Sequence, residues 1–404
     1  MGAMIRLALG NFEVDWGGHP FFINHLPLYQ PGDLTEMLVE YIEDRTGLSK
    51  LMPAKVLSKP LKDIAVRLRL LGYSLSSAAS DFKALQVEFG GSKELSFERL
   101  LEAIKKLDVS KVSREYSHDP YGKFFYYEIE PRLNLKEYLP SREEQADLSE
   151  MMENSNPWST LCMLAERREN LDVSLVWDFS EIIESGLEAD EAFMPHLEQA
   201  MRFLIVTEGS SDAAILRKAL DLLRPAIADF FYFVDMEAGY PFTGTGNLGN
   251  FCKGLASIGI LNKTLVVFDN DAEGVFKAGQ VKSLNLPSNL GVFTLPDIKE
   301  LRAVPTVGPG GRSVEDINGR AASIEAYLDL NWNCDRPPLI RWTSFVEKLG
   351  QYQGSLETKE AYFKRFLNLR AKEPGYDFSK IEAVLDRMVD ACAAIAAANP
   401  ASPP

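Results

Sequence analysis

Residues 203–295 contain four short apolar runs that alternate with three stretches of helical spacing. The apolar runs are 203-FLIVT-207, 230-FFYFVD-235, 264-TLVVF-268 and 291-GVFTL-295, and the helical stretches are 212–223, about 247–259 and 272–284. Strands that are buried on both faces are continuously apolar, and strands that alternate with helices pair in parallel. The pattern therefore predicts an α/β domain over residues 201–300, with a parallel four-stranded sheet flanked by helices.

The chain of 404 residues is long enough for two or three domains, since a domain has about 150 residues. Before the α/β domain we expect an α+β domain over residues 1–140. It should have short strands around Gly17-Gly18, helices over 34–107 and a β segment at 124–133. Residues 141–200 are acidic and have helical spacing, so we expect them to form a helical connector.

After the α/β domain we expect a loop and then a helical carboxy-terminal region, together covering residues 301–404. The loop is the Gly- and Pro-rich 305-PTVGPGGRS-313, and 320-RAASIEAYLDL-330 has helical spacing. Basic and aromatic residues alternate over 341–372, from Arg341 and Trp342 to Phe366 and Lys372. This strip is either a solvated face of amphipathic helices or a contact for nucleic acid.

Composition limits the class of protein. A hydrophobic content of 46% is that of a folded chain, and no run approaches the roughly 20 apolar residues that span a bilayer. We therefore expect a cytoplasmic protein with no membrane partner. The four cysteines lie far apart with no C-x-x-C pair, which argues against a zinc site. A net charge of −15 means that cations or a local basic strip must bring in any nucleic acid.

Acidic residues follow the first and third predicted strands of the α/β domain. Glu208 comes directly after 203–207, and Asp269 and Asp271 follow 264–268. Ligands of open parallel sheets collect at the carboxyl ends of the strands, and residues two apart in an extended segment point the same way. Glu208 can join the two aspartates only if strands one and three are neighbours. Asp212, four residues further on, could reach the same place from the first helical turn.

Such a group of carboxylates suits Mg²⁺ or Mn²⁺, which accept phosphate oxygens as further ligands. The alternative is that each acidic residue has a local role. Asp271 and Asp212 could cap the helices that follow them, and Glu208-Gly209 could be an ordinary strand-exit turn. In the metal-site interpretation, Gly209 lets backbone approach the site closely.

At these residues the sequence resembles the topoisomerase-primase (Toprim) domain, which has a Glu-Gly after its first strand and an Asp-x-Asp after its third. The resemblance covers about residues 201–296. It implies that Glu208 is the family glutamate, that Asp269 and Asp271 bind Mg²⁺ and that Asp212 is a further acidic residue of the site. The Gly-rich 244-GTGNLGNFCKG-254 is similar to the glycine and asparagine turn of the family, which places Gly246 and Asn247 at the substrate.

The likeness extends beyond that domain. The segments 4-MIRLALGNFEVDWG-17 and 27-PLYQPGD-33 resemble the leader domain of HEPN/Toprim-associated bacterial proteins, and 318-NGRAASIEAYLD-329 is similar to a segment that follows their Toprim part. Glu325 is similar to the later acidic residue of overcoming-lysogenization-defect nucleases; its alternative is an ordinary solvated helix glutamate. HEPN ribonucleases have four to six residues between Arg and His, whereas 114-REYSH-118 has three, so we expect no HEPN chemistry.

Among Toprim activities, hydrolysis demands the fewest additional parts. A topoisomerase needs a large gate, and a primase needs a zinc module that the cysteine spacing excludes. A nuclease needs metal ions, a water molecule and a basic group, for which Lys253 and Lys277 are candidates. The resemblance implies a Mg²⁺- or Mn²⁺-dependent nuclease acting on DNA or RNA in bacterial defence against phage or mobile elements.

A binding module is the alternative from a different class. In it, a degenerate Toprim fold senses a nucleotide or a partner protein without cleaving anything. The acidic triad Glu208, Asp269 and Asp271 favours the enzyme, whereas the acidic composition favours a regulated subunit. Besides nucleic acid, a protein from the same operon and further copies of the chain are candidate partners.

Overall fold

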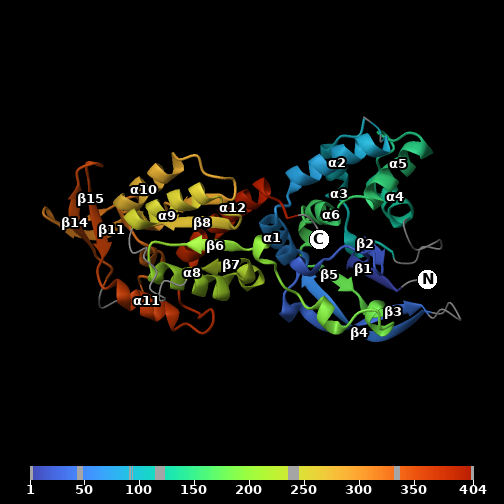
Figure 1. Ribbon diagram of the computed structural model, residues 1–404, viewed down its shortest axis with the longest axis horizontal. Helices are drawn as coiled ribbons and strands as arrows, with labels where there is room; N and C mark the ends of the chain where they lie inside the picture. The colour runs from blue at the N-terminus through green and yellow to red at the C-terminus, as the bar shows by residue number, and fades with distance from the viewer. Residues whose placement is uncertain are drawn as a thin grey trace. The chain divides into compact units, whose positions relative to one another are not determined.

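The computed structural model describes residues 3–42, 49–90, 92, 94–113, 123–234, 245–331 and 337–401. The chain divides into two compact units, one of Met1–Leu197 with Pro400–Pro404 and one of Glu198–Asn399. Both units combine helices with sheets, as Figure 1 shows. Among the described residues, none of the helices has the length and apolar content needed to cross a bilayer.

A five-stranded antiparallel sheet forms the centre of the first unit, with strand order β2-β1-β5-β4-β3. Its strands are β1 (Met4–Leu9), β2 (Phe12–Gly18), β3 (Leu34–Ile42), β4 (Ser49–Pro60) and β5 (Ser174–Asp178). The prediction of helices from residue 34 onward was wrong for β3 and β4. β3 is an edge strand with mostly exposed side chains, so its apolar spacing does not mark a buried face. The predicted connector 141–200 also supplies the central strand β5.

The helices of the first unit are α1 (Leu61–Leu71), α2 (Leu75–Phe89), α3 (Phe97–Ile104), α4 (Glu130–Leu133), α5 (Arg142–Glu153), α6 (Pro157–Leu164) and α7 (Ser180–Glu184). Of these, α1, α6 and α7 pack against the sheet, whereas α2 and α3 pack on α6 and α5 packs on α2. The β segment predicted at 124–133 was wrong, because a π-helical turn, Phe125–Ile129, runs into α4 there. Phe125, Ile129 and Leu133 are buried at four-residue spacing, which is a helical face.

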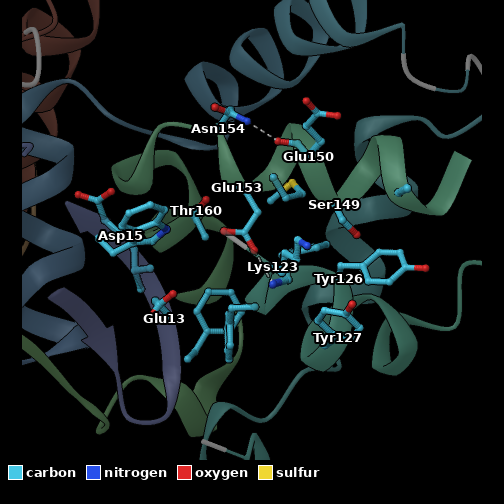
Figure 2. Close-up of a pocket in the computed structure, with 17 residues that line it drawn as sticks. Glu13, Asp15, Lys123, Tyr126, Tyr127, Ser149, Glu150, Glu153, Asn154 and Thr160 are labelled. Carbon is cyan, nitrogen blue, oxygen red and sulfur yellow. Dashed lines mark hydrogen bonds between the residues drawn. The ribbon is translucent and has the colours of Figure 1, made fainter. Parts of the chain in front are cut away.

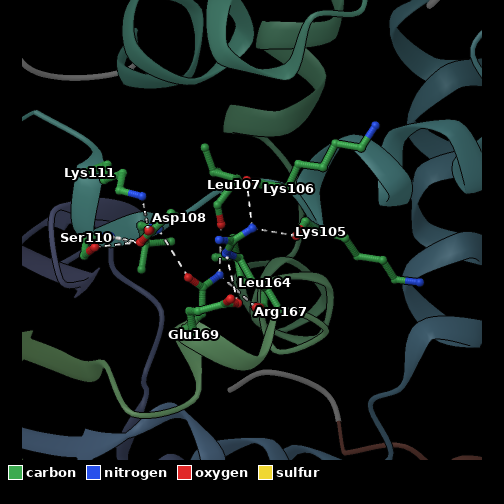
Figure 3. A network of polar contacts seen from close by, with 11 residues as sticks. Lys105, Lys106, Leu107, Asp108, Ser110, Lys111, Leu164, Arg167 and Glu169 are labelled. Atoms are coloured by element: carbon green, nitrogen blue, oxygen red, sulfur yellow. Dashed lines mark hydrogen bonds and ion pairs between the residues drawn. The ribbon is translucent and has the colours of Figure 1, made fainter.

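A buried asparagine fixes the loop after α3. The Asn170 side chain donates to the carbonyl oxygens of Leu107 (3.2 Å) and Leu164 (3.1 Å) and accepts from the Val109 backbone nitrogen (3.2 Å), within the network of Figure 3. Arg167 adds hydrogen bonds to the carbonyl oxygens of Lys105 and Lys106. These bonds satisfy backbone groups that no helix or strand pairs.

The second unit contains the predicted parallel four-stranded sheet, with strand order β10-β8-β6-β7. Its strands are β6 (Phe203–Val206), β7 (Phe231–Phe233), β8 (Lys263–Phe268) and β10 (Leu290–Thr294), and all neighbours pair in parallel. The crossover helices are α8 (Ser210–Leu223), α9 (Thr245–Ile258) and α10 (Ala272–Lys282). The mixed α/β architecture expected for this part of the chain is confirmed.

Helices cover both faces of this sheet. Val266 and Phe268 of β8 pack in one cluster with Leu248 and Cys252 of α9 and Val281 of α10. α8 and the last helix, α12 (Ser379–Ala398), pack against each other, and α12 also contacts β8 and β10. Figure 1 shows α9 and α10 on the side of the sheet opposite to α8.

The region 301–404 is not mainly helical, contrary to the prediction. Most of its first part forms a second sheet of order β12-β11-β14-β15, from β11 (Val304–Gly308), β12 (Gly311–Glu315), β14 (Ile340–Val346) and β15 (Gln351–Leu356). The predicted loop 305–313 is thus a hairpin, in which Gly311 turns with φ 96°. The helix predicted at 320–330 is replaced by β13 (Ala321–Ala322) and a 3-10 turn, Ile324–Tyr327. α11 (Lys359–Leu367) and α12 are helical.

Two glycines of α10 provide a test of how the chain turns after β8. A Cβ added at Gly274 would overlap the carbonyl oxygen of Asp269, whereas a Cβ at Gly279 would meet nothing within 4 Å. Gly274→Ala should therefore destabilise the protein by about 1–3 kcal/mol. Gly279→Ala should stabilise it by about 0.5–1 kcal/mol, because alanine loses less backbone entropy in a helix.

Urea unfolding monitored by circular dichroism measures both free energies of unfolding. Equal effects of Gly274→Ala and Gly279→Ala would contradict the close approach of α10 to the end of β8.

Candidate functional site

Glu208 and Asp269 meet at the carboxyl edge of the parallel sheet. β6 and β8 are direct neighbours, so the residues that follow them lie side by side, as the metal-site interpretation requires. The backbone nitrogen of Asp269 donates a hydrogen bond of 3.0 Å to Oε1 of Glu208. The glutamate at the end of β6 therefore contacts the Asp-x-Asp segment that follows the neighbouring strand, β8.

The segment after β8 stays extended, and the side chains of Asp269 and Asn270 contact different partners. Asn270 and Asp271 form the short strand β9, which pairs with β13. Oδ1 of Asp269 accepts a hydrogen bond of 3.2 Å from the Ile324 nitrogen. The amide of Asn270 instead donates to Oδ1 of Asp297 at 2.8 Å, so Asn270 belongs to a different network from the aspartates.

Asp271 caps α10, the local role that the sequence left open. Its Oδ1 accepts from the Gly274 nitrogen at 2.7 Å, while Oδ2 accepts from Nε2 of Gln353 at 2.9 Å. Gln353 lies in β15, and its Oε1 also accepts from the Glu273 nitrogen at 3.0 Å. Both Asp271 oxygens are thus held by protein donors.

Asp212 comes from the first turn of α8 and is buried, with 8% of its surface exposed. Its Oδ2 accepts from the Gly209 nitrogen at 3.0 Å, and its Oδ1 accepts from the Ser211 hydroxyl at 3.3 Å. Gly209 itself has an extended backbone, and a Cβ there would make only ordinary contacts. The fold alone therefore does not require glycine at position 209.

Glu325 is not a solvated helix residue. It lies in the 3-10 turn after β13 and is 3% exposed. Its Oε2 accepts from the Ser323 hydroxyl at 2.7 Å, and its Oε1 lies 3.8 Å from Nζ of Lys359, the first residue of α11. In the sequence, Lys359 is only one of the basic residues of 341–372, because no pattern among its neighbours predicts a contact with Glu325.

The carboxylates perturb one another. Desolvation raises the pKa of Asp269 well above its usual value, and the charges of Asp212, Glu208, Asp271 and Glu325 raise it further. Burial and then the charge of Glu325 raise the pKa of Asp212 from 3.8 to about 6, although Lys359 opposes the shift. Burial also raises the pKa of Asp271. The charge effects on Asp269 and Asp212 arise because these carboxylates lie near Glu325 and one another, an arrangement that repulsion alone disfavours.

The donor chemistry of this group suits a hard divalent cation, because every candidate donor is a carboxylate oxygen. Within the described residues, however, no three Asp, Glu, His or Cys side chains are arranged so that they could hold a metal as they stand. The hydrogen bonds from Gln353 and Gly274 to Asp271 account for part of this. Metal binding therefore requires some of these side chains to rotate.

Other predicted site residues lie on the surface. Lys253 is exposed on α9, without a hydrogen bond or ion pair from its ammonium group to any described residue, and Lys277 on α10 bonds Oε1 of Gln280 at 3.3 Å. Gly246 and Asn247 are exposed in the first turn of α9. The segment 114–118 and Cys334 lie outside the described residues.

The comparison with protein families gives a match in the amino-terminal half of the chain. Residues 1–200 match the family model of the HEPN/Toprim N-terminal domain 1. This match of 200 of the 404 residues supports the HEPN/Toprim-associated family, which is associated with nucleases. No curated protein and no solved structure matches the chain.

The raised pKa of Asp212 predicts how stability changes with pH. The carboxyl group of Asp212 has a pKa of about 6 in the folded protein and 3.8 in the unfolded chain, so the folded protein binds its proton more tightly. The resulting stabilisation is complete below pH 4 and is lost as the pH rises through 6. Asp212→Asn removes that dependence but keeps an oxygen for the Gly209 nitrogen. In EDTA, the variant should gain stability relative to wild type by up to about 3 kcal/mol between pH 4 and pH 8.

Urea unfolding of both proteins across this pH range measures the difference. A difference that is the same at pH 4 and pH 8 would show that Asp212 ionises as freely in the folded protein as in the unfolded chain.

Proposed function

We propose that this chain is a metal-dependent nuclease that hydrolyses phosphodiester bonds of DNA or RNA. The observation that carries the proposal is the convergence of acidic side chains from separate segments on one sheet edge, with Glu208 in direct contact with the Asp269 backbone. The residues that would hold Mg²⁺ or Mn²⁺ are Glu208, Asp212, Asp269, Asp271 and Glu325. The resemblance to Toprim domains and the family match of residues 1–200 support the same class of activity.

The fold offers groups for the phosphates beside these carboxylates. Because α8, α9 and α10 are the crossover helices of a parallel sheet, all three begin at the edge where the strands end. Backbone N–H groups of helix amino termini attract phosphate oxygens. Gly209 precedes α8, and Gly246 and Asn247 lie in the first turn of α9, so we assign these three to substrate contact.

A bound divalent ion would supply charge stabilisation for the phosphodiester and lower the pKa of an attacking water. The chain itself supplies the acceptors that hold the ion and a cation beside them. Lys359 is better placed for the basic role than Lys253, because its Nζ lies 3.8 Å from Oε1 of Glu325, whereas the ammonium group of Lys253 forms no hydrogen bond or ion pair with any described residue. We therefore assign to Lys359 the stabilisation of negative charge on the substrate.

A second candidate function is the non-catalytic sensor. It is favoured by the two protein donors on Asp271 and by the absence, within the described residues, of three groups that already suit a metal. A degenerate site that binds a nucleotide or a partner protein would have these properties. As the resemblance implies, we propose a cytoplasmic role in defence against phage or mobile elements in either case.

Cleavage assays separate the two functions. Plasmid, single-stranded DNA and transfer RNA are incubated with the protein in Mg²⁺ or Mn²⁺. Asp269→Asn keeps an acceptor for the Ile324 nitrogen but removes the charge, so it should lower the cleavage rate about 100-fold or more. Asp221→Asn is the matched control, because Asp221 is an exposed aspartate of α8.

The same assay ranks the lysines. Lys359→Met should slow cleavage by at least about tenfold, and Lys253→Met should leave it within about twofold. If wild type and Asp269→Asn are equally inert on every substrate with both metals, the nuclease proposal fails and the sensor remains.

A further inference from the structure

The first unit contains a cavity of about 740 Å³ that the carboxylate site does not involve. It lies between β2, the segment 123–127 that enters the π-helical turn, and α5, as Figure 2 shows. Its volume is in the range of small-molecule sites, which is about 300–1,000 Å³. The cavity therefore has room for a ligand of several tens of atoms.

The walls of this cavity are acidic and aromatic. Glu13, Asp15, Glu150 and Glu153 line it, and Lys123 is the one basic residue among its described lining residues. Aromatic rings on the walls include Trp16, Tyr126 and Tyr127, of which Trp16 and Tyr127 are more than one third exposed. Carboxylates beside aromatic faces favour cations and disfavour phosphorylated ligands.

Glu13 and Glu153 are held in fixed positions. Oε2 of Glu13 pairs with Nη2 of Arg6 at 2.7 Å, and Glu13 is 8% exposed. Oε1 of Glu153 accepts from the Phe125 nitrogen at 2.6 Å. Burial raises the pKa of Glu153 and the charge of Glu13 adds to the shift, although the hydrogen bond from Phe125 opposes it.

Asp15 is oriented by a buried histidine. His25 is 1% exposed, and its Nδ1 lies 3.1 Å from Nε1 of Trp158. Indole nitrogen only donates, so Nδ1 of His25 accepts and carries no proton. Nε2 of His25 then donates to Oδ2 of Asp15 at 2.8 Å, which leaves Asp15 as an acceptor on the cavity wall.

We propose that this cavity binds an aliphatic polyamine. Its ammonium groups would donate hydrogen bonds to Glu153 and Asp15, which lie on different walls of the cavity. Its hydrocarbon segments would pack along the tyrosine rings. The site is independent of the proposed nuclease function, because every lining residue belongs to the first unit.

Isothermal titration calorimetry with spermidine tests the proposal in the full chain, in EDTA and 0.15 M salt. We expect one site per chain, and Glu153→Gln should weaken binding about tenfold, because a charged hydrogen bond becomes a neutral one. Glu143→Gln removes the same charge from an exposed residue of the same helix, so it should change the affinity less than twofold. Tyr127→Leu should weaken binding several-fold.

Several outcomes would overturn the proposal. Equal weakening by Glu143→Gln and Glu153→Gln would mean that spermidine only screens the acidic surface. An unchanged affinity in Glu153→Gln, with its native circular dichroism, would place the site elsewhere. Asp269→Asn separates the two sites, since loss of spermidine binding in that variant would assign the polyamine to the carboxylates of the second unit.

Discussion

The parallel pairing of β6 with β8 is the constraint on which the candidate site depends. Because these strands are neighbours, Glu208 and Asp269 leave the sheet side by side, and the extended segment after β8 carries Asp271 to the same edge. Burial raises the pKa of Asp269, and the charges of the neighbouring carboxylates raise it further, a cost that a bound cation would offset.

The local roles of these residues coexist with the proposed metal role. Asp271 caps α10 and Asp212 accepts from Gly209, as ordinary helix-capping residues do. A cap uses one or two lone pairs of a carboxylate, which has about four acceptor sites. The bond from Gln353 is different, because β15 comes from a distant part of the chain and holds the second oxygen of Asp271.

The sequence predicted the parts of the fold that depend on local burial. Runs such as 264-TLVVF-268 are apolar because β8 is buried on both faces, so the strands and crossover helices could be placed within a few residues. β3 and β15 could not be predicted from the sequence, because an exposed edge strand is defined by the strand with which it pairs and not by a buried apolar run of its own. For the same reason no local pattern indicated that Lys359 lies beside Glu325 or that Gln353 contacts Asp271.

Direct titration with Mn²⁺, followed by electron paramagnetic resonance of the free ion, tests the central claim without assuming any substrate. At pH 8 the wild-type protein should bind Mn²⁺ at the sheet edge, and Asp269→Asn should weaken that binding by about tenfold or more, while Asp221→Asn leaves it unchanged. Equal Mn²⁺ binding by wild type and Asp269→Asn would contradict the claim that these carboxylates share a cation.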